Sequence, residues 1–181
     1  MLYHIKESIV PISFCDEVIK QGENKEISKA KIQEGNKADR SSDVSWLDEE
    51  KLGTSLTNLV IIANKESGWN YSLKEFEPLQ YTIYKKDDFY DWHIDSHNNP
   101  YDNGMVRKLS FTLCLNDEYT GGELEICEPH PDPKKTKFHK FDKITPGTMI
   151  IFYSGLWHRV LPVKTGFRKS LVGWTLGTKF Q

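Results

Sequence analysis

The sequence is poor in cysteine, with only Cys15, Cys114 and Cys127, and no two of them have the spacing of a paired motif. This excludes a disulfide framework as the basis of the fold and indicates a reducing compartment. An excess of charge of either sign is also absent, because 24 Lys and Arg side chains oppose 26 Asp and Glu. We therefore expect no nucleic-acid partner, since phosphate binding requires a basic surface.

Targeting signals and long hydrophobic runs are absent as well. The N-terminus has neither the basic start nor the apolar stretch of a signal peptide, and no segment approaches the roughly 20 apolar residues that cross a bilayer. No internal repeat is visible, and a chain of 181 residues suits one domain. We expect a single cytoplasmic domain over residues 1–181, without membrane contact, as a monomer or weak dimer.

The first part of the chain, about residues 1–78, predicts a helical support for the rest. Apolar residues recur at helical spacing over residues 12–19. A second helix is expected from an N-cap at Asp48 to the neighbourhood of Gly68. Between these helices, residues 34–42 are polar, and we interpret them as a loop that contacts the substrate.

From Leu79 onward the apolar residues recur with a period of two, which is typical of strands. About eight short strands separated by turn residues indicate a mainly β protein with flanking α-helices. The expected fold is a double-stranded β-helix, a jelly roll of the cupin-like type, over about residues 79–181, with the N-terminal helices packed on one sheet. The Pro-rich residues 128–133 interrupt the pattern and predict a loop.

A histidine and an aspartate two residues apart, His93 and Asp95, form the most informative pair. On a strand their side chains point to the same side, so both can bind one metal ion. His158, where a turn meets a strand, can complete the ligand set. Two histidines and one carboxylate leave coordination positions open, which is the ligand set of non-heme Fe(II) oxygenases.

Arg168 follows His158 by ten residues, beyond a turn at residues 164–166. We expect it on the neighbouring antiparallel strand, which returns alongside the metal ligands. A guanidinium can bind a carboxylate through two parallel hydrogen bonds. A dicarboxylic cosubstrate would then bind the metal at one end and Arg168 at the other.

With these residues in place, the chain resembles the Fe(II)- and 2-oxoglutarate-dependent dioxygenases, and among them the prolyl 4-hydroxylase group. The resemblance covers roughly residues 79–176. It rests on Tyr84, Tyr90, His93-Ile94-Asp95, Leu113-Cys114-Leu115-Asn116, Gly121-Gly122-Glu123-Leu124, Pro146-Gly147, His158 and Arg168. Residues 40–46 resemble the substrate-side finger loop of prolyl hydroxylases.

The resemblance implies an enzyme that hydroxylates a peptidyl residue, with proline as the preferred target. The reaction would be coupled to oxidative decarboxylation of 2-oxoglutarate to succinate and CO2. Catalytic Fe(II) would bind His93, Asp95 and His158, with O2 as the second cosubstrate and ascorbate as an accessory reductant. The implied partner is a proline-containing peptide or protein.

In the cosubstrate pocket, the resemblance assigns Arg168 to the far carboxylate of 2-oxoglutarate and Tyr84 to a second contact. Thr112 and Cys114, on one face of a strand, are expected to line the same pocket. Cys114 stands where some relatives carry tyrosine. The residues expected on the substrate side are Arg40, Asp43, Trp46, Tyr90, Trp92, Trp157 and Arg159.

Several alternatives remain open at this point. Trp92 and Trp157 suit a peptide groove and a protein core equally well. His97 follows Asp95 at a spacing that also occurs in zinc hydrolases. A lysyl or free amino acid hydroxylase is the nearest alternative activity, and the charge balance disfavours a nucleobase-repair oxygenase. A non-catalytic, ligand-binding β-helix module is the alternative of another class.

Overall fold

The computed structural model describes residues 1–30, 39–47, 50–96, 99–130 and 132–179. Within these ranges the chain forms two α-helices, one 3-10 helix and fifteen strands. The helices are α1 Ile12–Glu23, α2 Glu50–Glu66 and the 3-10 helix η1 Pro133–Lys135. The strands are β1 Tyr3–Lys6, β2 Ser28–Lys29, β3 Arg40–Ser41, β4 Asp43–Leu47, β5 Glu75–Phe76, β6 Leu79–Tyr84, β7 Phe89–His93, β8 Met105–Cys114, β9 Tyr119–Gly121, β10 Leu124–Glu128, β11 Lys137–Phe141, β12 Met149–Tyr153, β13 His158–Val160, β14 Val163–Gly166 and β15 Arg168–Thr178.

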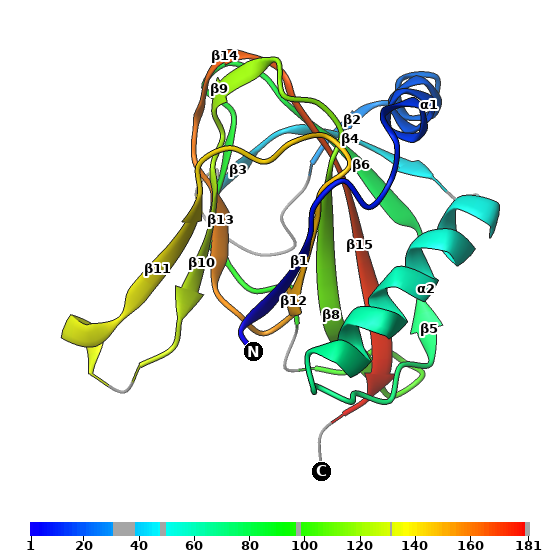
Figure 1. Ribbon diagram of the computed structural model, residues 1–181, viewed down its shortest axis with the longest axis vertical. Coiled ribbons are helices and arrows are strands. Elements are labelled where there is room, and N and C mark those ends of the chain that lie inside the picture. Colours follow the sequence, from blue (N-terminus) through cyan, green and yellow to red (C-terminus); the bar gives the residue numbers. More distant parts are fainter. Residues whose placement is uncertain (31–38, 48–49, 97–98, 131, 180–181) are drawn as a thin grey trace.

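The strands form two main antiparallel sheets that face each other (Figure 1). The larger sheet has eight strands in the order β1-β12-β8-β15-β6-β4-β2, with β5 paired to β15. The smaller sheet has the order β11-β10-β13-β7-β3, and β14 and β9 form a separate pair. This arrangement confirms the predicted mainly β, double-stranded β-helix fold.

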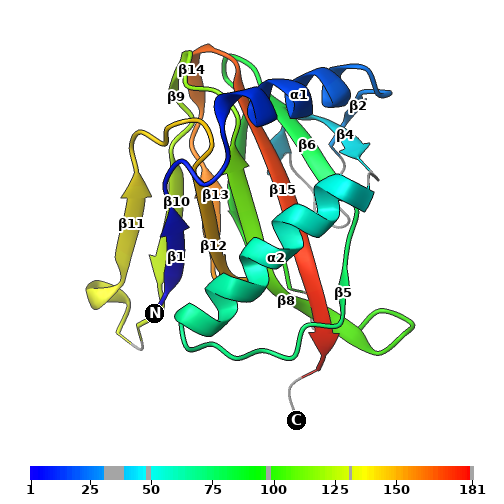
Figure 2. The ribbon, with the colours of Figure 1, turned by 45° about the vertical axis from the view of Figure 1, so that its right-hand side comes forward.

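Both helices cover the outer face of the larger sheet, and α2 crosses β8 and β15 there (Figure 2). Their buried side chains, including Val18 of α1 and Leu56 and Val60 of α2, belong to one apolar cluster with Tyr81 and Phe111 of the sheet. The predicted helical support is therefore confirmed. Neither helix in the described ranges is long and apolar enough to cross a bilayer.

The larger sheet is buried on both faces, and the two faces differ in polarity. All six residues of β6 are buried, although apolar Leu79, Tyr81 and Ile83 alternate with polar Gln80 and Thr82. The apolar side chains join the helix-covered cluster. Because alternate residues point to opposite faces, the polar ones face the smaller sheet. The space between the sheets is therefore lined by polar side chains of β6 as well as by apolar residues such as Leu124 and Phe152.

The segment 40–46, predicted as a finger loop, is largely strand. Arg40 and Ser41 of β3 pair with Tyr90 and Phe89 in the smaller sheet, whereas β4 pairs with β6 in the larger sheet. This short stretch therefore links the two sheets. The sequence did not predict these strands, because the segment is polar and the partners of its polar groups become apparent only in the folded structure. Residues 34–38 of the expected loop, the N-cap Asp48 and His97 lie outside the described residues.

Gly22 is required for close packing of α1 on the larger sheet. A Cβ at this position would lie 2.3 Å from the ring of Tyr81. Gly22→Ala is therefore expected to destabilise the fold by roughly 1–3 kcal/mol, measured by urea unfolding. Gly53→Ala in α2 is the control, because a Cβ there meets nothing within 4 Å. It should stabilise the chain by about 0.5–1 kcal/mol, and equal effects at both positions would contradict this account of packing.

Candidate metal and cosubstrate site

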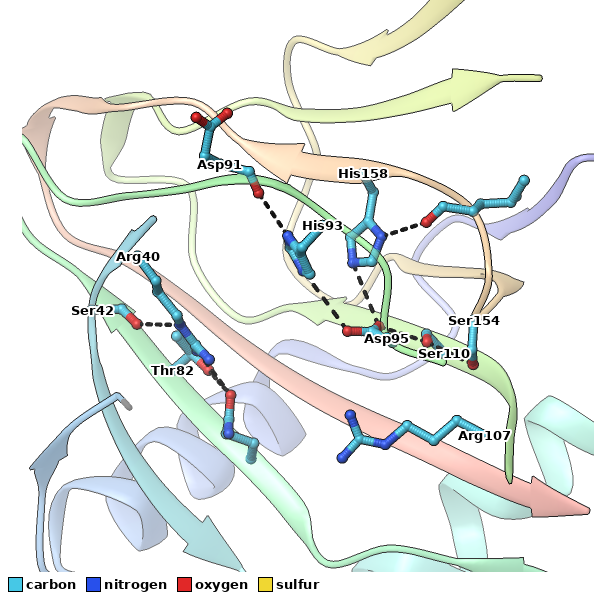
Figure 3. A network of polar contacts seen from close by, with 12 residues as sticks. Arg40, Ser42, Thr82, Asp91, His93, Asp95, Arg107, Ser110, Ser154 and His158 are labelled. Carbon is cyan, nitrogen blue, oxygen red and sulfur yellow. Dashed lines mark hydrogen bonds and ion pairs between the residues drawn. The ribbon is translucent and has the colours of Figure 1, made fainter. Parts of the chain in front are cut away.

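Three side chains with metal-binding atoms converge between the sheets. His93 ends β7, Asp95 follows two residues later, and His158 begins β13, where it pairs in register with His93. His93 Nε2 lies 3.8 Å from Asp95 Oδ1, and His158 Nε2 lies 3.4 Å from Asp95 Oδ2 (Figure 3). One ligand atom from each residue lies within 4.8 Å of the others. This spacing allows all three to bind the same ion.

Hydrogen bonds behind the ligands set their orientation. The Nδ1–H of His93 donates to the carbonyl of Asp91 at 2.7 Å, and that of His158 donates to the carbonyl of Leu156 at 2.9 Å. With Nδ1 protonated, each Nε2 keeps its lone pair for a metal. The Ser110 hydroxyl donates to Asp95 Oδ2 at 2.7 Å.

The electrostatics of the site favour the metal-binding forms of His93 and Asp95. Burial, followed by the neighbouring His158, lowers the pKa of His93. Burial raises the pKa of Asp95, but His158, His93 and the Ser110 hydroxyl more than offset this effect and hold it below its usual value. The imidazole therefore stays neutral and the carboxylate stays ionised, which are the forms that bind a metal ion.

A cavity of about 1080 Å³ extends from these ligands between the sheets, and Tyr84, Thr112 and Arg168 line it. Arg168 is only 3% exposed, and its guanidinium lies 5.4 Å from the centre of the Tyr84 ring. Its Nη1 donates to Ser170 Oγ at 3.2 Å, but its Nε has no partner among the described residues. A buried guanidinium with an unused donor fits a carboxylate ligand.

Arg168 reaches the cavity by a different route from the expected one. We predicted that it lies on the strand next to His158, but β15 belongs to the larger sheet and pairs with β6 and β8. The chain crosses between the sheets through β14. The arginine and the histidines therefore face each other across the cavity from opposite sheets.

The Gly121-Gly122 pair makes room for this arginine. Gly122 has a φ of +66°, and a Cβ on it would lie 2.9 Å from Cδ of Arg168. Only glycine combines that backbone conformation with the required space. Tyr119, which the sequence did not reveal as a site residue, also lies beside Arg168. Burial raises the pKa of Tyr119 to about 12, so its phenol stays neutral.

The comparison with protein families decides the assignment. The profile described as the 2OG-Fe(II) oxygenase superfamily matches residues 79–176, which include the three ligands and Arg168. The chain belongs to the 2OG-Fe(II) oxygenase superfamily. Fe(II) and 2-oxoglutarate are accordingly the metal and cosubstrate of this site. The donors fit them, because two imidazoles and one carboxylate leave open positions on Fe(II), and Arg168 offers the unused donor for a carboxylate.

The chain is similar in sequence to PKHD-type hydroxylases, and similar in fold to solved structures that include prolyl hydroxylases. A PKHD-type hydroxylase from Synechococcus sp. (strain CC9605) is 38% identical over 87 residues, which are 47% of this chain and 35% of the relative. The matched part thus spans about a third of that curated relative's length. A Pseudomonas putida prolyl-4-hydroxylase structure has a TM-score of 0.74 at 20% identity, covering 98% of this chain and 93% of that one. A Trichoplax adhaerens prolyl hydroxylase, in complex with a hypoxia inducible factor peptide fragment, has a TM-score of 0.72 at 22% identity. The match covers 96% of this chain and 82% of that one.

Three of the predicted substrate-side residues line the cavity of this superfamily member. The ring of Tyr90 stacks on that of His93, with ring centres 3.4 Å apart. The guanidinium of Arg40 lies 4.6 Å from the centre of the same Tyr90 ring. Trp46 is 47% exposed and also lines the cavity. Burial raises the pKa of Tyr90 to about 12, so the ring beside the metal ligand remains uncharged.

Four other predicted substrate residues lie away from the cavity. Asp43 is buried and forms ion pairs with Lys29 and Lys85, each at 2.6 Å. The remaining three are next to metal ligands in sequence and do not line the cavity; the two that lie within strands, Trp92 and Arg159, point away from it because strand neighbours alternate in direction. These three are Trp92, Trp157 and Arg159. The side chain of Arg159 pairs with a carboxylate instead of reaching a substrate.

Cys114 does not line the cavity either, whereas Thr112 does. The thiol of Cys114 is buried and points to the carbonyl oxygens of Asn116 and Ile144, at 3.1 and 3.2 Å. Burial raises the pKa of this thiol. Cys114 therefore contributes to the wall behind the pocket and makes no direct contact with the cavity.

Sequence reasoning missed Arg107, whose side chain enters the same cavity from β8. Its Nε donates to Glu77 at 2.7 Å, and its guanidinium lies 4.0 Å from the centre of the Trp174 ring. Strand alternation gave no signal, because a residue three positions before Ser110 should face away from it; the register shift between Thr175 and Leu176 in the pairing of β8 with β15 brings Arg107 to the cavity side. Without knowledge of its contact with Glu77, Arg107 is interpreted from the sequence as an ordinary exposed arginine.

Ser110 is expected to position the carboxylate of Asp95. Ser110→Ala removes the donor to Asp95 Oδ2 and should weaken Mn(II) binding by about 10- to 100-fold, measured by calorimetric titration. Ser45→Ala is the control, because Ser45 donates to the carbonyl of Gly22 at 2.8 Å on the helix-covered side of the sheet. That variant should lose stability without losing Mn(II) affinity. Unchanged affinity in Ser110→Ala would contradict the positioning role.

Proposed function

We propose that this chain is an Fe(II)- and 2-oxoglutarate-dependent hydroxylase that acts on prolyl residues of a peptide or protein. The observation that carries the proposal is the buried Arg168, which lines one cavity together with three metal-binding side chains and has no acidic partner among the described residues. This combination suits a short keto diacid that binds a metal at one end and a guanidinium at the other.

Each residue of the site has a defined part in the proposed reaction. His93, His158 and Asp95 would hold Fe(II) through atoms on one side and leave the opposite side open to ligands. Arg168 would bind the far carboxylate of 2-oxoglutarate, and Tyr84 would pack beside it. Bound Fe(II) and O2 supply the oxidising power for decarboxylation of the cosubstrate and hydroxylation of a C–H bond, with ascorbate as an accessory reductant. The protein supplies the orientation of the reacting groups.

A prolyl substrate is supported by the fold and by the shape of the cavity mouth. The structures most similar in fold include a prolyl-4-hydroxylase and a prolyl hydroxylase in complex with a peptide fragment. In the lining of the cavity, Trp46 is 47% exposed and presents aromatic surface, whereas the ring of Tyr90 is covered by His93 and Arg40. Flat aromatic side chains suit the apolar ring of proline at little entropic cost.

The direct test is incubation with Fe(II), 2-oxoglutarate, ascorbate and a panel of proline-containing peptides under air. We expect succinate formation and a gain of one oxygen atom in the peptide, with fragmentation placing the oxygen on proline. If the oxygen is found on lysine, or on a free amino acid in parallel assays, the enzyme is a lysyl or free amino acid hydroxylase and the prolyl assignment is wrong. Absence of succinate under all conditions would contradict the hydroxylase itself.

A second measurement needs no turnover. N-oxalylglycine, a mimic of 2-oxoglutarate that does not decarboxylate, should raise the melting temperature in the presence of Mn(II), because a ligand of the folded state stabilises it by mass action. The shift should require both the metal and the mimic. A melting temperature that stays the same with both present would argue against the cosubstrate pocket.

A further inference from the structure

Two of the three arginines that line the cavity, Arg40 and Arg168, have no acidic partner among the described residues, and Arg168 is already assigned to 2-oxoglutarate in the proposed function. The Nε of Arg40 donates to Ser42 Oγ at 2.8 Å, and its Nη2 donates to Gln80 Oε1 at 2.9 Å. Its guanidinium lies 4.6 Å from the centre of the Tyr90 ring. All three partners are neutral, and no carboxylate in the described ranges forms an ion pair with Arg40. Its positive charge is therefore uncompensated.

The remaining charges of the cavity do not supply this partner. Arg107 is neutralised by Glu77, whose carboxylate it meets with two nitrogens. Arg168 receives the far carboxylate of 2-oxoglutarate in the proposed function, and the other end of the cosubstrate is committed to the metal beside Asp95. Once metal and cosubstrate are bound, Arg40 is the cavity arginine left without a counter-charge among the described residues.

Arg40 is also close to the place where the substrate must react. Tyr90 lies between Arg40 and His93, stacked on the imidazole at 3.4 Å, so the thickness of one ring separates the guanidinium from a metal ligand. Arg40 and Arg107 extend into the space beside His93 and Asp95 from two sides (Figure 3). A group held by Arg40 would therefore be a near neighbour of the hydroxylated residue.

The fold holds Arg40 in place before any ligand arrives. Ser41, its neighbour on β3, hydrogen-bonds to Asp88, and Asp43 is held by Lys29 and Lys85. These contacts fix the segment that links the two sheets. A guanidinium that is already oriented loses little conformational entropy on binding, which favours affinity and selectivity.

We propose that Arg40 binds a carboxylate of the substrate, so that the enzyme prefers peptides with an acidic group next to the hydroxylated residue. This inference rests on the proposed function. An extended peptide advances about 3.3–3.6 Å per residue, so the acidic group belongs within about two positions of the target. The carboxylate can come from an Asp or Glu side chain or from the C-terminus of a short peptide. Trp46 flanks the same part of the mouth and can pack against the intervening residue.

The test uses fluorescein-labelled peptides that contain proline and carry Asp at one position, one or two residues before or after the proline. Each is compared with the same peptide carrying Asn in place of Asp. A second series has the proline near a C-terminus that is either free or amidated. Binding is measured by fluorescence polarisation with Mn(II) and N-oxalylglycine present, and KM is measured from succinate formation. We expect the acidic or free-acid member of at least one pair to bind roughly 10- to 100-fold more tightly. The pair that shows the difference identifies the source of the carboxylate.

Enzyme variants assign the preference to Arg40. Arg40→Gln should remove the discrimination, and Arg40→Glu should favour peptides with Lys in place of Asp. Arg159→Gln is the matched control, because Arg159 also lies 4.6 Å from an aromatic ring centre, that of Trp92, but on the outer face and paired with Glu125 at 2.7 Å. It should keep the full preference for the acidic peptide.

The possible failures are distinguishable. Succinate formation with equal affinity for the Asp and Asn peptides, and for free and amidated ends, would overturn the inference and leave the hydroxylase standing. A preference for acid that persists in Arg40→Gln would overturn the role of Arg40. Selective, Arg40-dependent binding without hydroxylation of any peptide would support the carboxylate subsite and contradict prolyl hydroxylation. Since the peptide exchange leaves the protein unaltered, misfolding of a variant cannot imitate the result.

Discussion

Replacing His93 or Asp95 by alanine is expected to abolish metal binding and turnover. Each change leaves two ligands, and Asp95→Ala also removes the anionic one. The loss of metal affinity should therefore exceed the factor of about 10 to 100 expected when only a hydrogen bond behind a ligand is disturbed. In the free protein the two side chains contact each other at 3.8 Å. Calorimetric titration with Mn(II) and succinate formation with Fe(II) provide the two measurements.

His139→Ala is the matched control for this experiment. His139 lies on β11 of the same sheet, and its Nε2 is 3.1 Å from a carboxylate oxygen of Glu128, so it also forms a histidine–carboxylate pair. A third ligand is missing from that pair among the described residues. The control should bind Mn(II) like the unaltered chain. Retention of metal by His93→Ala, or an equal loss in the control, would refute the assigned ligand set.

Removing Arg168 is expected to have the second-largest effect. Arg168→Ala leaves the far carboxylate of 2-oxoglutarate buried without a charged partner, which costs about 2–5 kcal/mol of binding. This corresponds to a rise of roughly 30- to 4000-fold in the KM for 2-oxoglutarate. Steady-state succinate formation over a range of cosubstrate concentrations gives the KM, and peptide affinity in the presence of Mn(II) shows whether the substrate side is intact.

Arg168→Lys separates charge from geometry. Lysine keeps the positive charge but provides no planar pair of donors, so its KM should fall between those of the alanine variant and the unaltered chain. Because Arg168 is buried without an acidic partner in the described part of the chain, its removal should not lower stability in the absence of ligand. An unaltered KM in Arg168→Ala would disprove the anchoring role.

The sequence predicted the metal ligands well because part of their signal is local. His93 and Asp95 are two residues apart and His158 stands at a turn, and these three became a metal site in combination with Arg168 and the other positions of the family resemblance. Strand alternation likewise predicted β6, β8, β12 and β15, whose apolar residues recur every second position. The His93–Asp95 spacing and the strand alternation are local signals, whereas His158 is distant in the chain and was selected together with Arg168.

The remaining features depend on contacts between distant residues, which spacing does not reveal. Arg107 is a cavity residue because Glu77, thirty residues away, holds it there. Residues 40–46 are interpreted from the sequence as a finger loop because their polar side chains find partners only in the fold, as Asp43 does with Lys85. The outward direction of Trp92 follows from alternation next to an inward-pointing ligand, and that rule could have been applied to it.

β15 carries both ends of the cavity on a single strand. Arg168 begins it, Trp174 lies six residues further along, and both face the cavity. A strand advances about 3.3 Å per residue, so these two side chains are separated by about 20 Å of continuous, hydrogen-bonded backbone. β8 on one side and β6 on the other hold this strand against bending. The distance between the two ends is thus a property of the rigid scaffold, and neither end can adjust to a ligand by moving toward the other.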